Sequence, residues 1–415
     1  MSAEPPDGPA PEGAASGRRP EDELSAPAQL ACELIAASSA NPPGDERAAA
    51  AVVVRALREL GVDDVGVVGE TEERANVLAR VRGRTGGRTL ILAGHLDTKP
   101  PGDLDAWETP PWEPAVRDGC MRGLGVADMK GALAAMVHTA ADAAEAELDG
   151  DLLLVFTADE ELGGTGARWL AEQGLLAADA AIIGEPAGIT RDWEAIRLIS
   201  RGLCFFRVTV AGTPMHSSIS DRLPSVNANV AMSRLIARFA AEAPGMLRYP
   251  EHRVVAAWPT LNPALVAAGG EGPGVVPASA HFVSDIRLVP GMTREEVRDD
   301  LEAFLAGAAA DDPGLAATLA VEHWHPPCEI DPAHPVVAAL TSAAAEVLGA
   351  APPFDAFPGG TDAPSFQRGA GIPTVPAFGP GLLTAAHRPN EAISLRSIDE
   401  ARAIYTATAR RFLGG

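Results

Sequence analysis

Apolar and polar positions follow one rhythm through the first part of the chain. Helical spacing of apolar residues covers 26–38 and 45–60, and the second pattern ends at Gly61. Between and after these patterns come short apolar runs, at 75–81, 89–94, 152–157 and 180–184. Helices that alternate with short buried strands are typical of an α/β domain with a mainly parallel sheet, and the sequence predicts that fold here.

The order of elements changes near residue 198. Apolar runs then predict four strands, at 204–210, 254–261, 279–288 and 317–324. Helical patterns follow the first and the third of these runs, at 224–243 and 293–308. The order strand, helix, strand, strand, helix, strand is that of a small ferredoxin-like α+β sandwich.

The first rhythm returns after this segment, with a helical pattern at 334–348, an apolar run at 374–378 and a helical pattern at 397–412. We therefore predict a catalytic α/β domain formed by 23–197 and 325–415, interrupted by an inserted α+β domain at 198–324. Residues 1–22 contain Pro, Gly, Ala, Ser and charged residues without an apolar period. Such a segment cannot offset the entropy lost on ordering, and we predict a disordered tail.

Composition narrows the classes of function. The chain has 415 residues, of which 47% are hydrophobic, which is enough for ordinary cores without disulfide or metal staples. Its 33 basic and 56 acidic side chains give a net charge of −23. This charge repels phosphate backbones and anionic lipids, so we expect neither nucleic acid nor a membrane as a partner, but a small molecule or a short peptide.

The spacing of the cysteines and the lengths of the apolar runs indicate the cellular compartment in which we expect the protein. The four cysteines form no CxxC pair, so they indicate buried, reduced thiols and no disulfide framework. No apolar stretch approaches about 18 residues, and the amino terminus lacks a basic segment followed by an apolar one. The sequence therefore predicts a cytoplasmic protein.

Candidate metal ligands occur where predicted strands end. His95 ends the strand in RTLILAGHLDT, and Asp97 lies two residues further on, which places both on one face. The Asp97 carboxylate is then positioned to accept the imidazole N–H that does not face a metal. Taken alone, a histidine at a strand end is more often a structural hydrogen-bonding residue than a ligand.

Carboxylates follow the same pattern. Asp128 comes just before a helical pattern, where it is either a helix N-cap or a metal ligand. Asp159, Glu160 and Glu161 follow the strand at 152–157, and Glu185 follows the next apolar run. Adjacent carboxylates repel one another unless cations or protons intervene, and open α/β sheets bind ligands at the carboxyl ends of their strands.

A second imidazole completes the set. His387 lies in the turn-like stretch LLTAAHRPNE, which would otherwise be an ordinary surface position. Two imidazoles and three carboxylates suit zinc first, with cobalt or manganese as alternatives. Asp128, Glu161 and Glu185 carry about three negative charges, so two divalent ions with a bridging hydroxide bring the cluster close to neutrality. Such a pair activates water, and Glu160 is the natural general base.

Eight ordered motifs cover about residues 30–412: GHLDTKP, RGLGVADMKGA, TADEELGG, IIGEP, GTPMHSS, DIRLVPG, GGTDAP and AHRPNE. In this order they resemble the M20 metallopeptidase family, which includes acetylornithine deacetylase, succinyl-diaminopimelate desuccinylase, aminoacylase-1 and glutamate carboxypeptidase. The resemblance implies that His95 and Glu185 bind one zinc ion, that Glu161 and His387 bind the other and that Asp128 bridges them. It also implies that Asp97 supports His95 and that Glu160 is the base.

The resemblance assigns roles in the inserted domain as well. His216 matches a histidine that family members bring to the scissile carbonyl, often from the partner subunit, where it would stabilise the oxyanion. Arg287 matches an arginine that binds the α-carboxylate of the substrate, a task that suits a guanidinium. Asn262 resembles an asparagine of the inserted domain, which the resemblance implies to be a lid over the active site. Pocket residues are expected at Gly359, Gly360 and Thr361.

Together these features predict a metal-dependent amidohydrolase that cleaves the amide bond of an N-acyl amino acid or a similar small acyl-amine, as deacetylases and desuccinylases do. The alternatives are a dipeptidase or carboxypeptidase with the same site, a biosynthetic acyl-transfer or amide-forming enzyme, and a non-catalytic binding protein. We also expect a homodimer formed through the inserted domain. The acyl group, the amine, the native metal and the subunit from which His216 acts are left open.

Overall fold

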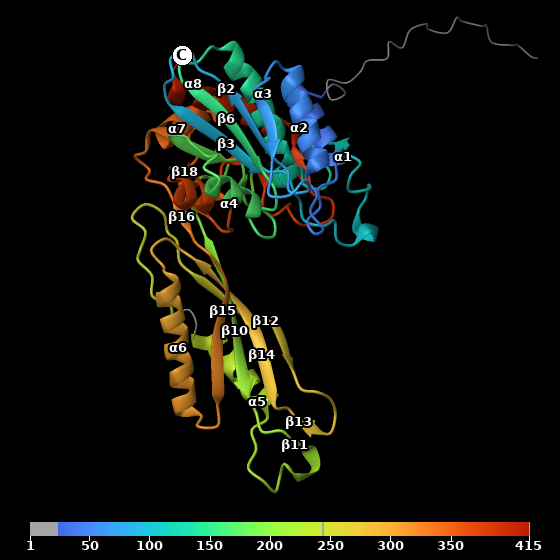
Figure 1. Ribbon diagram of the computed structural model, residues 1–415, viewed down its shortest axis with the longest axis vertical. Coiled ribbons are helices and arrows are strands. Elements are labelled where there is room, and N and C mark those ends of the chain that lie inside the picture. Colours follow the sequence, from blue (N-terminus) through green and yellow to red (C-terminus); the bar gives the residue numbers. More distant parts are fainter. Residues whose placement is uncertain (1–23, 243–244, 415) are drawn as a thin grey trace, which may run out of the picture.

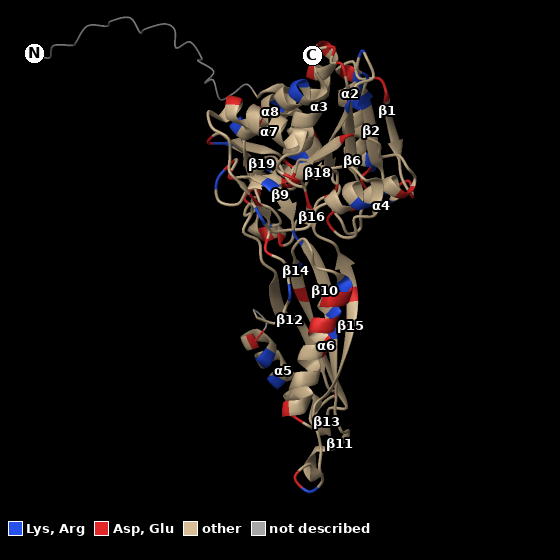
Figure 2. Cartoon of the chain, turned by 90° about the vertical axis from the view of Figure 1, so that its left-hand side faces the viewer, with Lys and Arg blue, Asp and Glu red and all other residues tan. Residues whose placement is uncertain are grey.

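The computed structural model describes residues 24–242 and 245–414 of the chain. The predicted disordered tail, 1–22, lies outside the described residues. Figure 1 shows two units: a broad α/β unit that contains both the first and the last parts of the described chain, and a long, narrow unit that extends from it. In the view turned by 90°, acidic and basic residues occur along both units (Figure 2).

The α/β unit is built on a six-stranded sheet with the order β1-β2-β6-β3-β7-β18. The strands are β1 Val65–Val68, β2 Asn76–Val81, β3 Thr89–His95, β6 Asp151–Thr157, β7 Ala180–Ile183 and β18 Thr374–Val375. The four strands β6, β3, β7 and β18 run parallel, whereas β2 is antiparallel to β6 and β1 to β2. The predicted, mainly parallel α/β sheet is confirmed, with an antiparallel edge that includes the unpredicted β1.

Helices cover both faces of this sheet, which explains why its strands are continuously apolar. Leu90 and Leu92 of β3 pack in the same core as α1, α3 and α8, whereas Ile91 and Ala93 pack in a second core with α4. The helices of the unit are α1 Ala26–Ala36, α2 Arg47–Glu59, α3 Gly131–Glu145, α4 Thr165–Glu172, α7 Pro335–Leu348 and α8 Leu395–Leu413. None of the helices in 24–242 and 245–414 is both long and apolar enough to cross a bilayer.

Short strands complete the α/β unit and carry loops of the site. One small sheet contains β4 Ala115–Arg117, β5 Cys120–Arg122 and β20 Ala392–Ser394. Another pairs β8 Pro186–Gly188 with β19 Gly379–Leu382. A third, at the junction with the narrow unit, contains β9 Ile196–Ser200, β16 Cys328–Glu329 and β17 Phe354–Phe357.

The narrow unit has the strand order β12-β14-β10-β15, and every neighbouring pair is antiparallel. Its elements are β10 Gly202–Ala211, α5 Ala228–Glu242, β12 Thr260–Gly269, β14 Ser279–Leu288, α6 Arg294–Asp311 and β15 Ala316–His325. This order and pairing are those of a ferredoxin-like sandwich. The short pair β11 Met215–His216 and β13 Val275–Val276 lies at its far tip (Figure 1).

Local sequence explains where α6 of this unit begins and why one of its strands was predicted at the wrong position. Thr293 caps α6 by accepting a hydrogen bond from the backbone N–H of Glu296, and its hydroxyl donates to the Glu296 carboxylate. The strand predicted at 254–261 is wrong, because the structure places β12 at Thr260–Gly269. Val255 and Ala257 are buried in a loop, so they supplied an apolar alternation without a strand. The true strand is an exposed edge and lacks that signal.

The crossings between the units lie close to the predicted boundaries. The boundary predicted at 197 and 198 falls inside β9, which pairs with strands of the α/β unit, so the first crossing is at Arg201, between β9 and β10. The return follows His325, the last residue of β15. The inserted unit is therefore tethered by two adjacent chain segments.

Candidate metal centre

The centre is organised around Asp128, in the turn before α3. Its Oδ1 lies 3.0 Å from Nε2 of His95, which ends β3. Its Oδ2 lies 3.1 Å from Nε2 of His387, which comes from the loop after β19. Each oxygen of one buried carboxylate therefore faces a different imidazole, and this is the arrangement of a bridging ligand.

Two further carboxylates divide between the imidazoles. Glu161 Oε1 lies 3.0 Å from Nε2 of His387, and Glu185 Oε1 lies 3.7 Å from Nε2 of His95. The structure thus brings together all five predicted metal ligands, in two groups that share Asp128. A Glu161 oxygen also lies within 4.8 Å of a His95 nitrogen, so the pairing of ligands with each ion stays a prediction from the family resemblance.

The chemistry of these donors fits two divalent cations. Burial, followed by the negative charge of Asp128, raises the pKa of Glu185 well above its usual range. Burial lowers the pKa of His387, but its contacts with Asp128 and Glu161 outweigh this and raise it to about 10. Without cations the cluster therefore holds protons, and cations would replace those protons. Two imidazoles with hard carboxylate oxygens are ligands for a borderline divalent ion.

Asp97 supports this cluster, partly in a way that was not predicted. We expected its carboxylate to accept the free imidazole N–H of His95, but the closer partner of Nδ1 is the Asp97 backbone oxygen, at 2.9 Å, against 3.6 Å for Oδ1. The carboxylate instead accepts hydrogen bonds from the backbone N–H groups of Glu160 and Glu161, at 3.1 and 3.2 Å. Asp97 therefore positions both a histidine and the turn that carries two glutamates.

Glu160 lies beside the candidate ligands His95 and Glu185. Its carboxylate, a His95 ring nitrogen and a Glu185 oxygen lie within 4.8 Å of one another. Burial raises the pKa of Glu160 well above its usual range, and the nearby carboxylates of Asp362 and Glu161 add to the increase. Glu160 is partly exposed, so it is open to water and to substrate. This position suits a group that exchanges protons with a reacting molecule.

Sequence reasoning missed Glu391, which holds the turn that presents Asp128. Its buried carboxylate accepts hydrogen bonds from the backbone N–H groups of Gly125, Ala127 and Asp128, at 2.9, 2.7 and 3.0 Å. The only signal was its place at the end of the motif AHRPNE, four residues after His387.

A second missed group lies behind Asp97. Asn41 donates from Nδ2 to Asp97 at 2.9 Å and to Asp159 at 2.8 Å. Arg74 pairs with Asp159 at 3.1 Å and with the buried Glu46 at 2.8 Å. The loop between α1 and α2 is thereby joined to the site through buried polar contacts.

The structure does not bring His216 to the metal ligands. It lies at the tip of the inserted unit, remote from the α/β unit in Figure 1, and its Nδ1 accepts a hydrogen bond from the backbone N–H of Ser218 at 3.2 Å. Within this chain it is an exposed residue at the end of the short strand β11.

The other predicted substrate residues lie near the junction. Because Gly202 pairs with Leu288, Arg287 lies at the end of the inserted sheet that meets the α/β unit. Arg287 and Asn262 both contact Asp285, at 3.4 and 2.6 Å. The backbone oxygen of Thr361 lies 3.1 Å from His325 Nε2.

The loop 359–362 connects this junction to the metal edge. An added Cβ at Gly360 would lie 3.3 Å from the ring of His325 and 3.7 Å from the backbone oxygen of Arg201. Asp362, next to the buried Thr361, accepts a hydrogen bond from Thr157, the last residue of β6, at 2.6 Å. A substrate that reaches from the metals to the inserted sheet would pass this loop.

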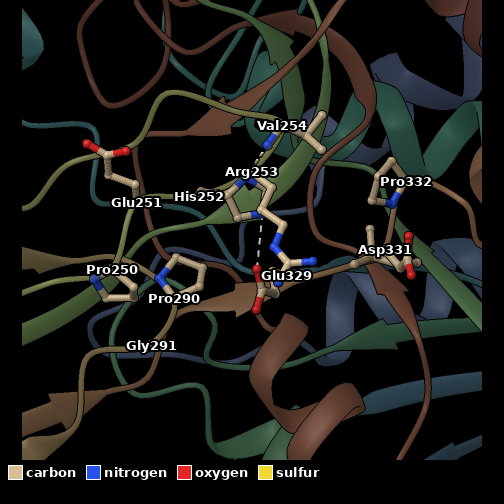
Figure 3. A pocket seen from close by; sticks show the side chains of 11 residues that line it. Pro250, Glu251, His252, Arg253, Val254, Pro290, Gly291, Glu329, Asp331 and Pro332 are labelled. Atoms are coloured by element: carbon tan, nitrogen blue, oxygen red, sulfur yellow. Dashed lines mark hydrogen bonds and ion pairs between the residues drawn. The ribbon is translucent and has the colours of Figure 1, made fainter.

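A separate cavity of about 490 Å³ lies between the two units (Figure 3). Its walls are the loop 250–254 with Pro290 and Gly291 on one side, and 329–332 on the other. His252 Nε2 lies 3.1 Å from Glu329 Oε2 and joins the two walls. None of the predicted site residues lines this cavity.

Comparisons with known proteins agree with this architecture. Residues 91–411 match the sequence model of Peptidase family M20/M25/M40. An acetylornithine deacetylase from Proteus mirabilis (strain HI4320) is 31% identical over 375 residues, which cover 90% of this chain and 92% of that protein. The M20 family metallo-carboxypeptidase Sso-CP2 from Sulfolobus solfataricus superposes with a TM-score of 0.75 at 19% identity, over 94% of this chain and 99% of that one. The dipeptidase Dug1p from Saccharomyces cerevisiae gives 0.71 at 17% identity, over 93% and 95% of the two chains.

Proposed function

The chain belongs to peptidase family M20/M25/M40, whose members hydrolyse amide or peptide bonds, and from that premise we propose that it is a zinc-dependent hydrolase of N-acyl amino acids or similar small acyl-amines. The observation that carries the proposal is the contact of the two Asp128 oxygens with two different imidazoles, His95 and His387, with Glu160 beside them. The identity to a deacetylase over most of both chains supports an N-acyl amino acid as the substrate. The choice of zinc rests on the two imidazole ligands.

Each residue of the candidate site has its own role in the proposed reaction. Two bound divalent ions would supply an acidified water and a polarised carbonyl. His95, Asp128, Glu161, Glu185 and His387 would hold those ions. Glu160 accepts the proton of the attacking water and passes it to the nitrogen of the leaving amine, so that one carboxylate serves first as base and then as acid.

The inserted unit contributes binding and charge stabilisation. Arg287 would bind the α-carboxylate of the substrate, and Asn262 would hold the lid in register through Asp285. His216 would donate a hydrogen bond to the oxyanion. Since it lies at the tip of its own chain, we place it in the active site of a second subunit.

A homodimer through the inserted unit is supported by exposed apolar side chains there. Leu265 and Val266 of the edge strand β12 are 57% and 54% exposed, and Val230 of α5 is 46% exposed. An edge strand with an apolar surface pairs readily with a second copy of itself. The dimer and the cytoplasmic location stay predictions.

A peptidase of the same mechanism is the second candidate. Its support is the fold shared with solved proteins described as a metallo-carboxypeptidase and a dipeptidase. Purified enzyme, loaded with zinc, should be assayed against N-acetyl amino acids, N-succinyl amino acids and dipeptides in parallel. A kcat/KM at least about tenfold higher for one acyl-amino acid than for every dipeptide supports the deacylase, and the reverse order supports the peptidase. Absence of bound metal with no turnover of any substrate would contradict both.

A further inference from the structure

Arg201 stands at the first crossing between the two units and has an unusual environment for an arginine. Its Nε is buried and has no hydrogen-bond partner within 24–242 and 245–414. No Asp or Glu side chain of those residues lies within ion-pair distance of its guanidinium, since none of the ion pairs there includes Arg201. A buried guanidinium nitrogen without an acceptor is costly. The side chain as a whole is only partly buried, and its terminal nitrogens are not among the buried atoms, so they are the part of the guanidinium that a partner from outside the chain can reach.

The charges around Arg201 do not neutralise it. The nearby carboxylate of Asp355 is occupied on both oxygens, by Arg197 at 2.8 Å and by the backbone N–H of Ala356 at 2.8 Å. Asp285, the other acid at this junction, is shared between Arg287 and Asn262. The ion pairs at this junction thus engage Arg197 and Arg287 and leave Arg201 unpaired among the described residues, in a chain whose net charge is −23.

The environment of Arg201 includes a second positive charge, that of Arg287, and an aromatic ring. Burial lowers the pKa of Arg201, and the like charge of Arg287 lowers it further. The Arg201 guanidinium carbon lies 6.0 Å from the centre of the Trp258 ring. Contact with an aromatic face engages the plane of a guanidinium and leaves its N–H edge available for a carboxylate.

The location connects Arg201 to the reaction. Its backbone N–H donates to Phe357 at 3.2 Å, and its backbone oxygen approaches Gly360, which belongs to the loop that reaches the end of β6 through Asp362. Arg287 lies in the inserted sheet, next to Leu288, which pairs with Gly202, the residue after Arg201. A molecule that extends from the metal centre toward the inserted unit therefore meets two arginines.

We propose that Arg201 is a second anion subsite and that the preferred substrate is an N-acyl amino acid with two carboxylates, one bound by Arg287 and one by Arg201. This inference rests on the proposed hydrolase function. The second carboxylate comes either from a dicarboxylic acyl group or from an acidic amino acid. Both sources present the same chemistry, a carboxylate that satisfies the vacant N–H edge of a guanidinium.

The experiment compares substrates that differ by one charge. In one arm, N-succinyl-L-leucine is compared with N-succinamoyl-L-leucine, in which the terminal carboxylate is an amide. In the other arm, N-acetyl-L-glutamate is compared with N-acetyl-L-glutamine. The zinc-loaded wild type should prefer the dianion in one arm by about tenfold to a hundredfold in kcat/KM, the range of a charge-assisted contact, and the arm identifies the source of the carboxylate.

Variants separate recognition from structural support. Arg201→Met should erase that preference through KM while the rate on the monoanionic partner substrate changes less than about threefold. Arg207→Met is the matched control, because Arg207 is a neighbouring arginine on β10 that is paired with Glu322, and it should keep the full preference. Equal loss on all substrates in the Arg201→Met variant would overturn the subsite, because it would indicate a structural role.

Two readouts keep the test decisive if the Arg201→Met variant does not fold or no substrate turns over. The wild-type preference alone already decides, because equal rates on charged and amidated partners in both arms contradict the inference while leaving the hydrolase function intact. Calorimetric binding of the same pairs to the zinc-loaded Glu160→Gln variant gives the comparison without turnover. If no pair is turned over by the wild type but a dianion binds more tightly by about tenfold, the proposed reaction fails and the subsite stands. Equal binding in both arms contradicts the subsite.

Discussion

The α/β unit and the inserted unit use buried polar groups very differently. In the α/β unit, buried charged residues lie at or just after the carboxyl ends of β3, β6 and β7. They are His95, Asp159, Glu161 and Glu185, and Asp128 is buried with them. In the inserted unit, the buried polar residues among 202–242 and 245–325 are only Ser284, Asp285 and Asp300. The α/β unit assembles its candidate site from segments that are distant in sequence. The inserted unit carries its functional candidates His216, Asn262 and Arg287 at exposed or partly exposed positions.

This difference predicts that substitutions in the two units will have different effects. Mutual repulsion of buried carboxylates makes the α/β unit depend on cations, so its changes should affect metal content and chemistry together. None of the described residues of the inserted unit forms a hydrogen bond or ion pair with a candidate metal ligand of this chain, so their changes should alter catalysis or substrate affinity with the metals still bound. The following variants test that separation.

The largest effect on chemistry is expected from Glu160→Gln. The amide keeps the shape of the side chain but cannot accept the proton of water, so kcat should fall by about 10²- to 10⁴-fold. Zinc content, measured on the same sample by mass spectrometry, should not change, because the five candidate ligands are intact. A loss of less than about tenfold would remove Glu160 from the role of base.

In the inserted unit, His216→Ala should lower kcat by about 10²- to 10³-fold, the usual cost of one oxyanion donor, with full metal occupancy. Because His216 lies at the tip, we expect it to act across subunits. Inactive Glu160→Gln and His216→Ala homodimers, mixed under exchange conditions, should then regain activity, since one hybrid site has both groups. A mixture that stays inactive although hybrid dimers are demonstrated would show that His216 acts within its own chain or not at all.

Glu391→Gln should weaken metal binding by about 10- to 100-fold, the usual effect of removing a group that orients a ligand. An amide offers one oxygen and an NH₂ group to three backbone N–H donors, so the turn that carries Asp128 loses its fixed position. Competition with a zinc chelator measures the change. Glu346→Gln, a change in an exposed glutamate paired with Arg411, is the control and should bind zinc as the wild type does.

Arg287→Lys should raise KM by about tenfold with little change in kcat, because a point charge does not reproduce the two parallel contacts of a guanidinium. Substrates with an amidated α-carboxylate should be poor for the wild type and nearly unaffected by the change. Steady-state kinetics on matched acid and amide substrates provide the measurement. Equal wild-type rates on both would exclude a carboxylate-binding role for Arg287.

The smallest effect concerns stability and pH. Burial, followed by the charge of Asp97, raises the pKa of Glu46 from 4.5 to about 7. The folded state therefore binds the proton more tightly than the unfolded state, and this contribution to stability is present at low pH and declines as pH rises from about 4.5 to about 7. Glu46→Gln should flatten that decline. Urea unfolding of zinc-saturated protein at several pH values tests this, and an unchanged slope would contradict it.

The candidate site was largely predictable because strand ends are visible in the sequence. His95, Glu161 and Glu185 follow apolar runs, and parallel strands bring their carboxyl ends to one edge of a sheet. Glu391 and Asn41 were not predictable in this way, because their roles depend on hydrogen bonds to turns that are distant in sequence.

The fold was predicted less well at its edges. The exposed strands β1 and β12 have too few buried residues to show an apolar period, and the buried loop residues Val255 and Ala257 imitated one. The position of His216 relative to the metals depends on how two units are arranged in space, which local patterns do not determine. The pattern within each unit was therefore more informative than the relation between them.

The measurement that tests the comparison most directly is the metal stoichiometry of three proteins, the wild type, Asp128→Ala and His216→Ala, after zinc loading and gel filtration. We expect two zinc ions per chain in the wild type and in His216→Ala, and at most one in Asp128→Ala, which lacks the carboxylate that contacts both His95 and His387. Two ions per chain in Asp128→Ala, or fewer than two in the wild type, would contradict a dimetal centre bridged by Asp128.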